Sequence, residues 1–429
     1  MDIRSLDELH PQEVEALVAR NREAFREVLP QVQEIVARVR AEGDEALHRF
    51  TRAFDGVDLP SLEVTPEETR QAYAAVDEGL LKALRKAAAH IERYHALQRP
   101  EERLVPLAPG LEAGWVVRPI ERVGCYAPGG RAVYPSSVLM TGVPARLAGC
   151  PVRILCVPPG PDGSVPAPTL VAADLAGFQR VFKVGGAQAI AAMAYGTETI
   201  PKVDKIFGAG NLWVTAAKVW VSQDVAVDLP AGPSEVLILA DEAAPPRWVA
   251  ADLLAQAEHG PDSVCLLVTT SPALAQAVAR EVQALARSIP TGERALAALE
   301  RNGALLVARD LDAAVEFANR FAPEHLQIVV RDPETILPRV THAGSVFLGA
   351  HSPVAAGDYA SGPNHVLPTA GAARSYGGLS LWAFLRLVPV QRLTPQALAD
   401  LGEAVVRLAQ AEGLPGHAQA VRVRLEEAQ

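Results

Sequence analysis

A glutamine and a histidine that could act together lie in residues 256–262 (QAEHGPD), at the end of a helix predicted over 246–258. Gln256 and His259 are three positions apart, so a helix would present both side chains on one face. The glycine and proline that follow end the helix and leave the pair at an open terminus. The pair could therefore bind a ligand or a metal ion. The alternative is a surface helix end at which His259 interacts favourably with the helix dipole.

A second reactive segment, residues 321–326 (FAPEHL), places Glu324 directly before His325, between a predicted helix and a predicted strand. The two side chains have ordinary pKa values of about 4.3 and about 6.5. Such a pair could divide general-base catalysis between a substrate and a water molecule. The common alternative for an isolated Glu-His dipeptide is a solvated turn.

Two further segments carry acidic and imidazole side chains. Residues 350–380 lose helical periodicity and become rich in glycine, proline and serine, as functional loops often do. Asp358 lies there in a glycine-flanked turn, where a metal-binding carboxylate or an ordinary turn aspartate would both fit. Near the end of the chain, the sequence EGLPGH brings Glu412 and His417 close together, although an ordinary turn between helices also explains it.

Four of these side chains, Gln256, His259, Asp358 and His417, offer only nitrogen and oxygen ligands. Such a set suits zinc, with manganese or cobalt as alternatives. Spacing along the sequence does not establish that the four converge. A metal site is therefore a hypothesis that rests on residue type.

Glycine-rich turns follow three predicted strands, in residues 124–130 (GCYAPGG), 184–188 (VGGAQ) and 207–211 (FGAGN). Backbone N–H groups at such strand-to-helix turns can approach an anion, so they could bind a nucleotide or a phosphate. The sequence contains neither GxGxxG opening a helix nor a GxxxxGK[ST] phosphate loop, so ordinary turns remain the alternative. A further segment, 230–235 (PAGPSE), crosses back toward the second α/β unit, and Ser234 could reach the cleft between the two units.

The elements that must position these residues alternate between short apolar strands and alanine-rich helices. In a first run, strands are predicted at 122–126, 153–157, 180–183, 204–207 and 235–239, and helices near 137–148, 166–176, 187–196 and 211–221. In a second run, helices are predicted at 246–258, 272–287 and 310–321, and strands at 264–269, 303–308, 326–330 and 345–348. This alternation predicts parallel sheets covered on both faces by helices.

The expected fold class is therefore α/β, with two Rossmann-like parallel-sheet domains facing a cleft, N-terminal helices and a helical C-terminal tail. We expect residues 1–120 to form an N-terminal helical region that packs mainly with the second α/β domain. Residues 121–237 would form the first α/β domain, on the nucleotide side. Residues 238–380 would form the second, with the metal and catalytic residues, and 381–429 a helical tail for dimerisation.

Composition narrows the class of protein. The 429 residues carry 40 Lys and Arg against 50 Asp and Glu, a net charge of −10 that disfavours binding to nucleic acid. The four cysteines show no CxxC spacing, so we expect reduced thiols. The acidic N-terminus is unlike a signal peptide, and no apolar stretch is long enough to span a membrane. These features predict a cytoplasmic enzyme without membrane contact.

Taken together, the motifs resemble the histidinol dehydrogenase family over about residues 120–420. The match runs in order through CYAPGG, VGGAQAI, KIFGAGN, PAGPSE, AQAEHGPDS, FAPEHL, GDYASGPNHVLPT and EGLPGH. The resemblance implies an enzyme that oxidises L-histidinol to L-histidine through L-histidinal, using two NAD⁺ and water. It also implies one Zn²⁺ per subunit and a homodimer with shared active sites, in which the tail of one chain completes the site of its partner.

The resemblance further assigns roles to individual residues. It implies Glu324 and His325 as the catalytic pair. It implies that NAD is contacted by Tyr126, Gln188 and Asn211, and that the metal ligands are Gln256, His259, Asp358 and His417. Substrate contacts would come from Ser234, His325, Glu412 and the four metal ligands.

Overall fold

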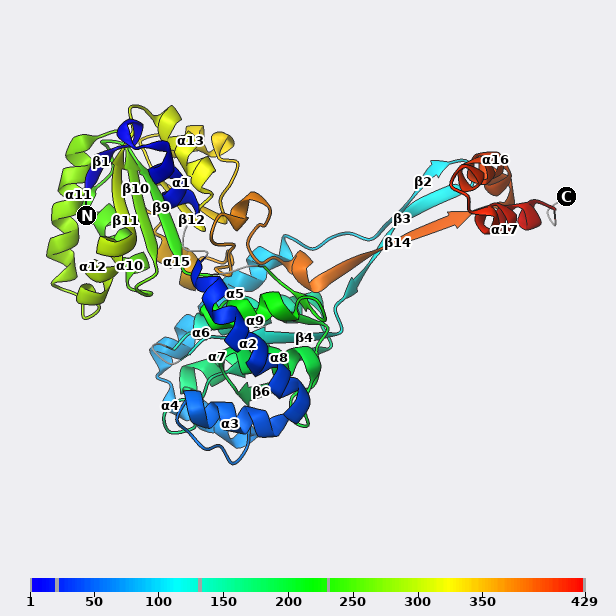
Figure 1. Cartoon of the computed structure of the whole chain (residues 1–429), viewed down its shortest axis with the longest axis horizontal. Coiled ribbons are helices and arrows are strands. Elements are labelled where there is room, and N and C mark those ends of the chain that lie inside the picture. The colour runs from blue at the N-terminus through cyan, green and yellow to red at the C-terminus, as the bar shows by residue number, and fades with distance from the viewer. Residues whose placement is uncertain (1, 20–22, 130–132, 230–231, 427–429) are drawn as a thin grey trace. The chain divides into compact units, whose positions relative to one another are not determined.

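The computed structural model describes residues 2–19, 23–129, 133–229 and 232–426. It divides into two compact units, one formed by Met1–Gln98 with Ile120–Ala383 and the other by Arg99–Pro119 with Phe384–Gln429 (Figure 1). The end of the CYAPGG motif and the start of PAGPSE lie outside the described residues. The first unit holds both α/β domains, which confirms the predicted fold class.

The first α/β domain is built on a five-stranded sheet in the order β6-β5-β4-β7-β8, with every pairing parallel. Its strands are β4 (Arg122–Tyr126), β5 (Val152–Val157), β6 (Arg180–Lys183), β7 (Lys205–Phe207) and β8 (Ala226–Val227). The alternating helices are α6 (Pro135–Ala148), α7 (Ala167–Ala176), α8 (Gly186–Tyr195) and α9 (Leu212–Val221). Because both faces of the sheet are covered, the interior strand β4 is apolar and buried from Val123 onward.

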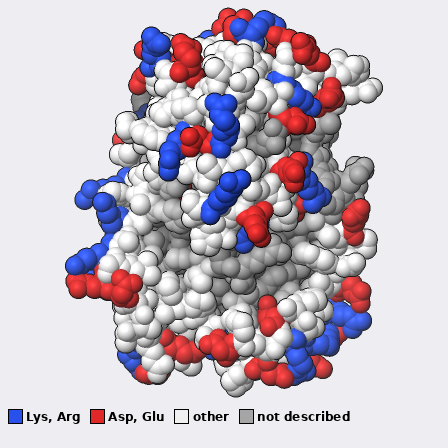
Figure 2. Space-filling model, turned by 90° about the vertical axis from the view of Figure 1, so that its left-hand side faces the viewer, with Lys and Arg blue, Asp and Glu red and all other residues white. Residues whose placement is uncertain are grey.

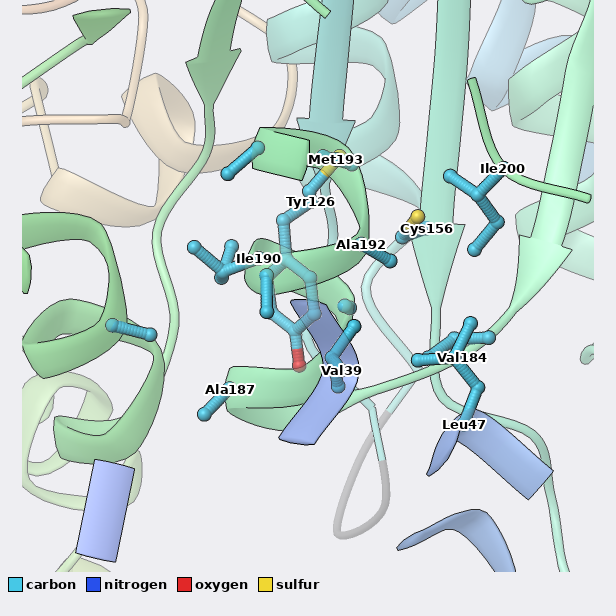
Figure 3. Close-up of a cluster of buried hydrophobic side chains, with 14 of the residues drawn as sticks. Val39, Leu47, Tyr126, Cys156, Val184, Ala187, Ile190, Ala192, Met193 and Ile200 are labelled. Carbon is cyan, nitrogen blue, oxygen red and sulfur yellow. The ribbon is translucent and has the colours of Figure 1, made fainter. Parts of the chain in front are cut away.

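Four N-terminal helices pack on this first domain, whereas α1 (Pro11–Ala19) packs on the second. The prediction that the N-terminal region packs mainly on the second domain is therefore wrong. The helices are α2 (Glu23–Glu42), α3 (Asp44–Phe54), α4 (Pro66–Ala75) and α5 (Glu78–Ala96). Val39 of α2 and Leu47 of α3 lie in one buried cluster with Ile190 and Met193 of α8 (Figure 3). Helical periodicity reveals which face of a helix is buried but not which partner covers it. The sequence therefore could not identify the neighbour.

The second α/β domain has a six-stranded parallel sheet in the order β1-β11-β10-β9-β12-β13. Its strands are β1 (Ile3–Ser5), β9 (Glu235–Ala240), β10 (Val264–Thr269), β11 (Gly303–Val307), β12 (His325–Val329) and β13 (Ser345–Leu348). Its helices are α1 (Pro11–Ala19), α10 (Pro246–Ala257), α11 (Pro272–Ala286), α12 (Gly292–Asn302), α13 (Leu311–Phe321), α14 (Pro333–Ile336) and α15 (Val354–Tyr359). The predicted boundary at 237/238 cuts through β9, which belongs wholly to this sheet.

The second unit is an antiparallel three-stranded sheet followed by two helices. The strands are β2 (Arg103–Ala108), β3 (Leu111–Pro119) and β14 (Leu385–Leu393), and the helices are α16 (Pro395–Ala411) and α17 (Pro415–Glu426). Residues 103–119 therefore form two paired strands, of which β3 also pairs with β14 of the tail, and they are not part of a helical N-terminal region. The predicted all-helical tail likewise begins with a strand. These strands were missed because they are largely exposed, without the alternation of a half-buried strand.

Two surface features bear on the class of protein. Along the described ranges, every helix is too short or too polar to cross a lipid bilayer. On the face of the molecule drawn in Figure 2, basic and acidic side chains are interspersed. That face therefore carries a mixed electrostatic field, with neither sign dominating.

A stability prediction follows from Asp55 at the C-terminal end of α3. Burial raises the pKa of Asp55 from 3.8 to about 6, and its Oδ2 atom makes no hydrogen bond to a described residue. A carboxyl whose pKa is raised on folding contributes stability below its unfolded pKa and loses that contribution as pH rises through the folded value. We therefore expect Asp55→Asn to stabilise the protein by about 1–2 kcal/mol at pH 8, after allowance for solvent screening, and by almost nothing at pH 3.5.

Urea unfolding of both proteins at the two pH values measures this difference. Asp58→Asn is a control of opposite sign, because the hydrogen bond from Arg52 lowers the pKa of Asp58. Equal stability of Asp55→Asn and the parent protein at pH 8 would contradict the prediction.

Candidate active site

The catalytic pair predicted from FAPEHL lies where α13 ends and β12 begins. α13 ends at Phe321, and Ala322 then adopts a left-handed backbone conformation with φ of 51°. His325 is the first residue of β12, and both Glu324 and His325 are buried. The solvated-turn alternative is thereby excluded for this dipeptide.

The backbone of Glu235, the first residue of β9, holds both side chains. The Glu235 N–H donates to Glu324 Oε2 at 2.7 Å, and the Glu235 carbonyl lies 2.8 Å from His325 Nδ1. A carbonyl can only accept, so Nδ1 must carry the proton when the ring is neutral. The other nitrogen, Nε2, is then the basic one. It makes no hydrogen bond to a described residue and lies 3.5 Å from Asp358 Oδ1.

The electrostatics of this cluster are set by burial and by three neighbouring charges. Burial raises the pKa of Glu324 to about 8. Burial alone would lower the pKa of His325, but the Glu324 and Asp358 carboxylates outweigh it and raise the pKa to about 9. To act as a base, His325 must be neutral at working pH, which requires a lower pKa. The negative charge of Asp358 must therefore be compensated before His325 can act as a base.

Asp358 belongs to the short helix α15 and is a favourable cation ligand. Burial alone would raise the pKa of this carboxyl, but the contact with His325 and the charges of His365 and His259 lower it below its ordinary value. His365 also fixes the position of α15, because its Nδ1 lies 2.7 Å from the Asp358 carbonyl and its Nε2 lies 3.1 Å from Ser137 Oγ. Sequence reasoning assigned no role to His365. Its place in the GPNH segment, seven residues after Asp358, was the only signal.

Gln256, His259 and Asp358 line one pocket, so the structure brings these three predicted residues together. α10 ends at Ala257, so His259 follows the helix instead of lying on its last turn. Tyr134 and Arg294 also line the pocket and were not singled out from the sequence. Arg294 lies on α12, a helix that the sequence analysis had not predicted.

The donor set of this pocket fits a divalent cation, although it is incomplete within the first unit. The side chain of Gln256 is buried, and its Nε2 has no hydrogen-bond partner among the described residues. An amide nitrogen donates, so it is available to an acceptor on a bound ligand, whereas a cation would be bound by the amide oxygen. Across the described ranges, no three His, Cys, Asp or Glu side chains gather into a metal site. A tetrahedral ion held by Gln256, His259 and Asp358 would take its fourth ligand from another protein segment, from water or from the substrate.

The predicted residues of the tail belong to the second unit. Glu412 directly follows α16, and His417 lies in the first turn of α17. Both are exposed. The predicted ligand set is thus divided between the two units, three residues in the first and His417 in the second.

The three glycine turns lie at the carboxyl ends of β4, β6 and β7, where ligands of parallel sheets usually bind. Tyr126 connects two of them. Its buried hydroxyl accepts a hydrogen bond from Gly186 N at 3.1 Å, and its carbonyl lies against Gly208. Gln188, in the first turn of α8, is also buried.

Asn211 has a different place, at the exposed N-terminus of α9. Its Oδ1 accepts hydrogen bonds from Trp213 N and Val214 N, both at 3.1 Å, and so caps the helix. The amide nitrogen of the same side chain remains as a donor. At the second sheet, Ser234 directly precedes Glu235 and is partly exposed.

An enzyme that acylates a cysteine would need a thiol nucleophile, with Cys125 or Cys265 as the candidate. The structure excludes both. Cys125 and Cys265 are fully buried, and burial raises the pKa of each thiol well above its ordinary value. Catalytic cysteines need the opposite environment, because the thiolate is the nucleophile.

A parallel α/β domain with glycine turns, beside a second domain with a buried Glu-His pair and a nitrogen–oxygen ligand pocket, defines a nucleotide-dependent dehydrogenase class of enzyme. A family model described as histidinol dehydrogenase matches residues 18–425. The chain belongs to the histidinol dehydrogenase family, whose members are NAD-linked oxidoreductases.

Individual relatives agree with this assignment. The histidinol dehydrogenase of Methanothermobacter thermautotrophicus is 48% identical over 425 residues, covering 99% of this chain and all of the relative. That of Archaeoglobus fulgidus is 50% identical over 412 residues, covering 96% of this chain and 99% of the relative. The crystal structure of histidinol dehydrogenase from Elizabethkingia anophelis is similar with a TM-score of 0.94 at 40% identity, covering 100% of this chain and 98% of the other.

Proposed function

We propose that this protein oxidises L-histidinol to L-histidine through L-histidinal, in two hydride transfers to two NAD⁺ with uptake of one water. The observation that carries the proposal is the buried Glu324–His325 pair, held by Glu235 and facing the Asp358 carboxylate. An alcohol oxidation needs one proton acceptor, and the following aldehyde oxidation also needs an activated water. Two different buried bases at one site match these two requirements.

His325 takes the alcohol proton on Nε2 while the hydride leaves the substrate carbon. Its Nδ1–H is committed to the Glu235 carbonyl, so the ring keeps one orientation through the reaction. Nε2 makes no hydrogen bond to a described residue, so it is available to the substrate hydroxyl. The same nitrogen serves again as base when the hydrated aldehyde is oxidised.

Glu324 takes the proton of the water that adds to the aldehyde. One of its oxygens accepts the Glu235 N–H, and this leaves the other oxygen for the water. Burial of the pair keeps bulk water away and retains the aldehyde between the two oxidations. The two half-reactions therefore share one site and use its carboxyl differently.

Gln256, His259, Asp358 and His417 would hold one Zn²⁺ per subunit. When bound, that ion would orient the substrate nitrogens and compensate the charge of Asp358. This compensation would lower the pKa of His325, so that the ring is neutral, as a base must be. Ser234, Glu412, His325 and the metal ligands would contact the substrate. The buried Gln256 lines the same pocket as His259 and Asp358, and this supports the assignment.

The glycine turns of the first domain would bind NAD⁺. Asn211 would contact the dinucleotide through its side-chain amide nitrogen, at a helix N-terminus whose partial positive charge favours the pyrophosphate. Tyr126 and Gln188 would contact it from the two neighbouring turns. The hydrogen bond between the Tyr126 hydroxyl and Gly186 N supports a preformed site.

We further propose a homodimer in which Glu412 and His417 complete the active site of the partner. The first unit provides three of the four predicted ligands, and the second unit provides His417 and Glu412, which are both exposed. Helix α16 presents an exposed apolar stripe of Leu401, Val405 and Leu408, spaced at one face of the helix. A second copy of this chain would cover that stripe.

Counting the NADH produced from L-histidinol tests the reaction. We expect two NADH per substrate, measured at 340 nm with limiting histidinol, because both oxidations occur before release. Incubation with a chelator should abolish turnover, and added Zn²⁺ should restore it. A yield of one NADH would contradict the two-step reaction, and no NADH at all would favour a metallohydrolase that uses Glu324 as base.

Glu324→Gln tests the division of work between the two bases. The glutamine oxygen can still accept the Glu235 N–H, so the structure should be preserved while the basic carboxylate is lost. We expect oxidation of L-histidinal to fall by about 10²-fold or more, and oxidation of L-histidinol to fall far less. Glu316→Gln, on the exposed face of α13, is the matched control and should behave as the parent protein. Equal loss of both half-reactions would reject this mechanism.

Subunit mixing tests the shared site. His259→Asn and His417→Asn proteins should each be inactive, but a heterodimer would contain one site with both native histidines. Random re-association should then recover roughly a quarter of the parent activity, since half of the dimers are mixed and each has one intact site. Absence of activity in verified heterodimers would show that each subunit builds its own site.

A further inference from the structure

We propose that the buried ion pair Lys218–Asp228 is a positioning device that fixes the Gly208 turn in the form that binds NAD⁺. This inference rests on the proposed cofactor site in the glycine turns. Neither residue belongs to that site's predicted contacts, and neither was singled out from the sequence. Both side chains are almost completely buried, with exposed fractions of 5% and 0%.

The pair binds both polar backbone groups of Gly208. Asp228 Oδ2 accepts the Gly208 N–H at 2.7 Å, and Lys218 Nζ donates to the Gly208 carbonyl at 2.8 Å. Lys218 and Asp228 are themselves ion-paired, and Lys218 also reaches the Leu229 carbonyl at 3.3 Å. Rotation of either peptide group that flanks Gly208 would therefore leave a buried charged side chain, Lys218 or Asp228, without its backbone partner.

The third constraint on this turn is steric. Gly208 has φ of +112°, and a Cβ there would lie 2.1 Å from the carbonyl oxygen of Tyr126. The turn thus contacts the backbone of β4 on one side and is hydrogen-bonded to the two charged side chains on the other. Only glycine fits between them.

The two charged residues come from elements on either side of the turn. Lys218 lies on α9, the helix that begins just after the turn, and Asp228 directly follows β8. The Asp228 N–H donates to the Ile206 carbonyl at 3.0 Å and so continues the pairing of β8 with β7. The pair consequently fixes the turn relative to both the sheet and α9, whose N-terminus is capped by Asn211.

An ion pair is a costly way to fill a buried space, because apolar side chains of similar volume are often as stable. Its advantage here is geometric, because an apolar pair could bind neither the N–H nor the carbonyl of Gly208. A preformed turn lowers the free energy that NAD⁺ would otherwise spend on ordering it. The pair therefore increases the affinity for NAD⁺ and has no effect on the proposed histidinol pocket of the second domain.

The test compares Lys218→Met, Asp228→Leu and the double variant with Val221→Ala. Val221 is a fully buried residue at the end of α9, whereas the turn precedes the start of that helix, so it provides a matched loss of core packing. The double variant removes both charges, so it leaves no unpaired buried ion and keeps the comparison possible if the single variants do not fold. KM for NAD⁺, KM for histidinol and kcat are measured for each protein, together with the melting temperature.

We expect KM for NAD⁺ to rise by about tenfold or more in the double variant, as for a turn that is binding-competent a tenth of the time. KM for histidinol should stay within about twofold of the Val221→Ala protein. If KM for NAD⁺ in the double variant matches that of Val221→Ala, the pair is merely structural and the proposal is wrong.

Hydrogen exchange of the parent protein gives a second readout that needs no variant. Without NAD⁺, the Gly208 amide should already be protected, because Asp228 holds it. Rapid exchange at Gly208 would overturn the proposal.

Asn211→Ala separates the failure of this proposal from the failure of the proposed cofactor site. If Asn211→Ala leaves KM for NAD⁺ unchanged, the cofactor site itself is misplaced. If Asn211→Ala raises KM while the ion-pair variants resemble Val221→Ala, only the positioning role is rejected.

Discussion

The arrangement of the active site depends on the backbone of one residue, Glu235. Its N–H and carbonyl bind the side chains of Glu324 and His325, and its own carboxylate accepts the Ala370 N–H at 2.9 Å. Three segments far apart in the sequence therefore meet at the first residue of β9. β9 lies between β10 and β12, so the sheet fixes its position even though the backbone groups of Glu235 themselves bind side chains. Catalytic geometry is consequently inherited from the sheet and does not depend on a mobile loop.

The two α/β domains use opposite ends of their sheets. In the first domain, the glycine turns follow β4, β6 and β7 at the carboxyl ends of the strands, as is usual for nucleotide binding. In the second domain, Ser234 and His325 lie at the amino ends of β9 and β12. At that end the approaching chain can place side chains directly against the unpaired first peptides of the strands, which is how Glu235 comes to bind the catalytic pair.

Much of the architecture could be predicted from the sequence, because the strands and helices of parallel domains have strong apolar patterns. Strand β4 was predicted over its full extent, and the pattern around Gln256 and His259 correctly indicated a helix terminus. The buried environment of Glu324 could not be predicted, because it depends on the register of β12 against β9. Lys218 and Asp228 were missed for a related reason: a lone lysine in a helix and a lone aspartate after a strand look like surface residues until their pairing is known.

The antiparallel sheet of the second unit has a consequence for how the chain is made. Its middle strand, β3, pairs with β2 beside it in sequence but also with β14, which begins at Leu385. During translation the β2–β3 hairpin is complete long before its other neighbour exists, and at ordinary elongation rates the interval is on the order of tens of seconds. Throughout that time β3 presents an open hydrogen-bonding edge, and Leu104, Val105 and Leu107 of β2, on its other side, are exposed apolar residues. A ribosome-bound chain is thus vulnerable to aggregation at this hairpin until β14 has emerged.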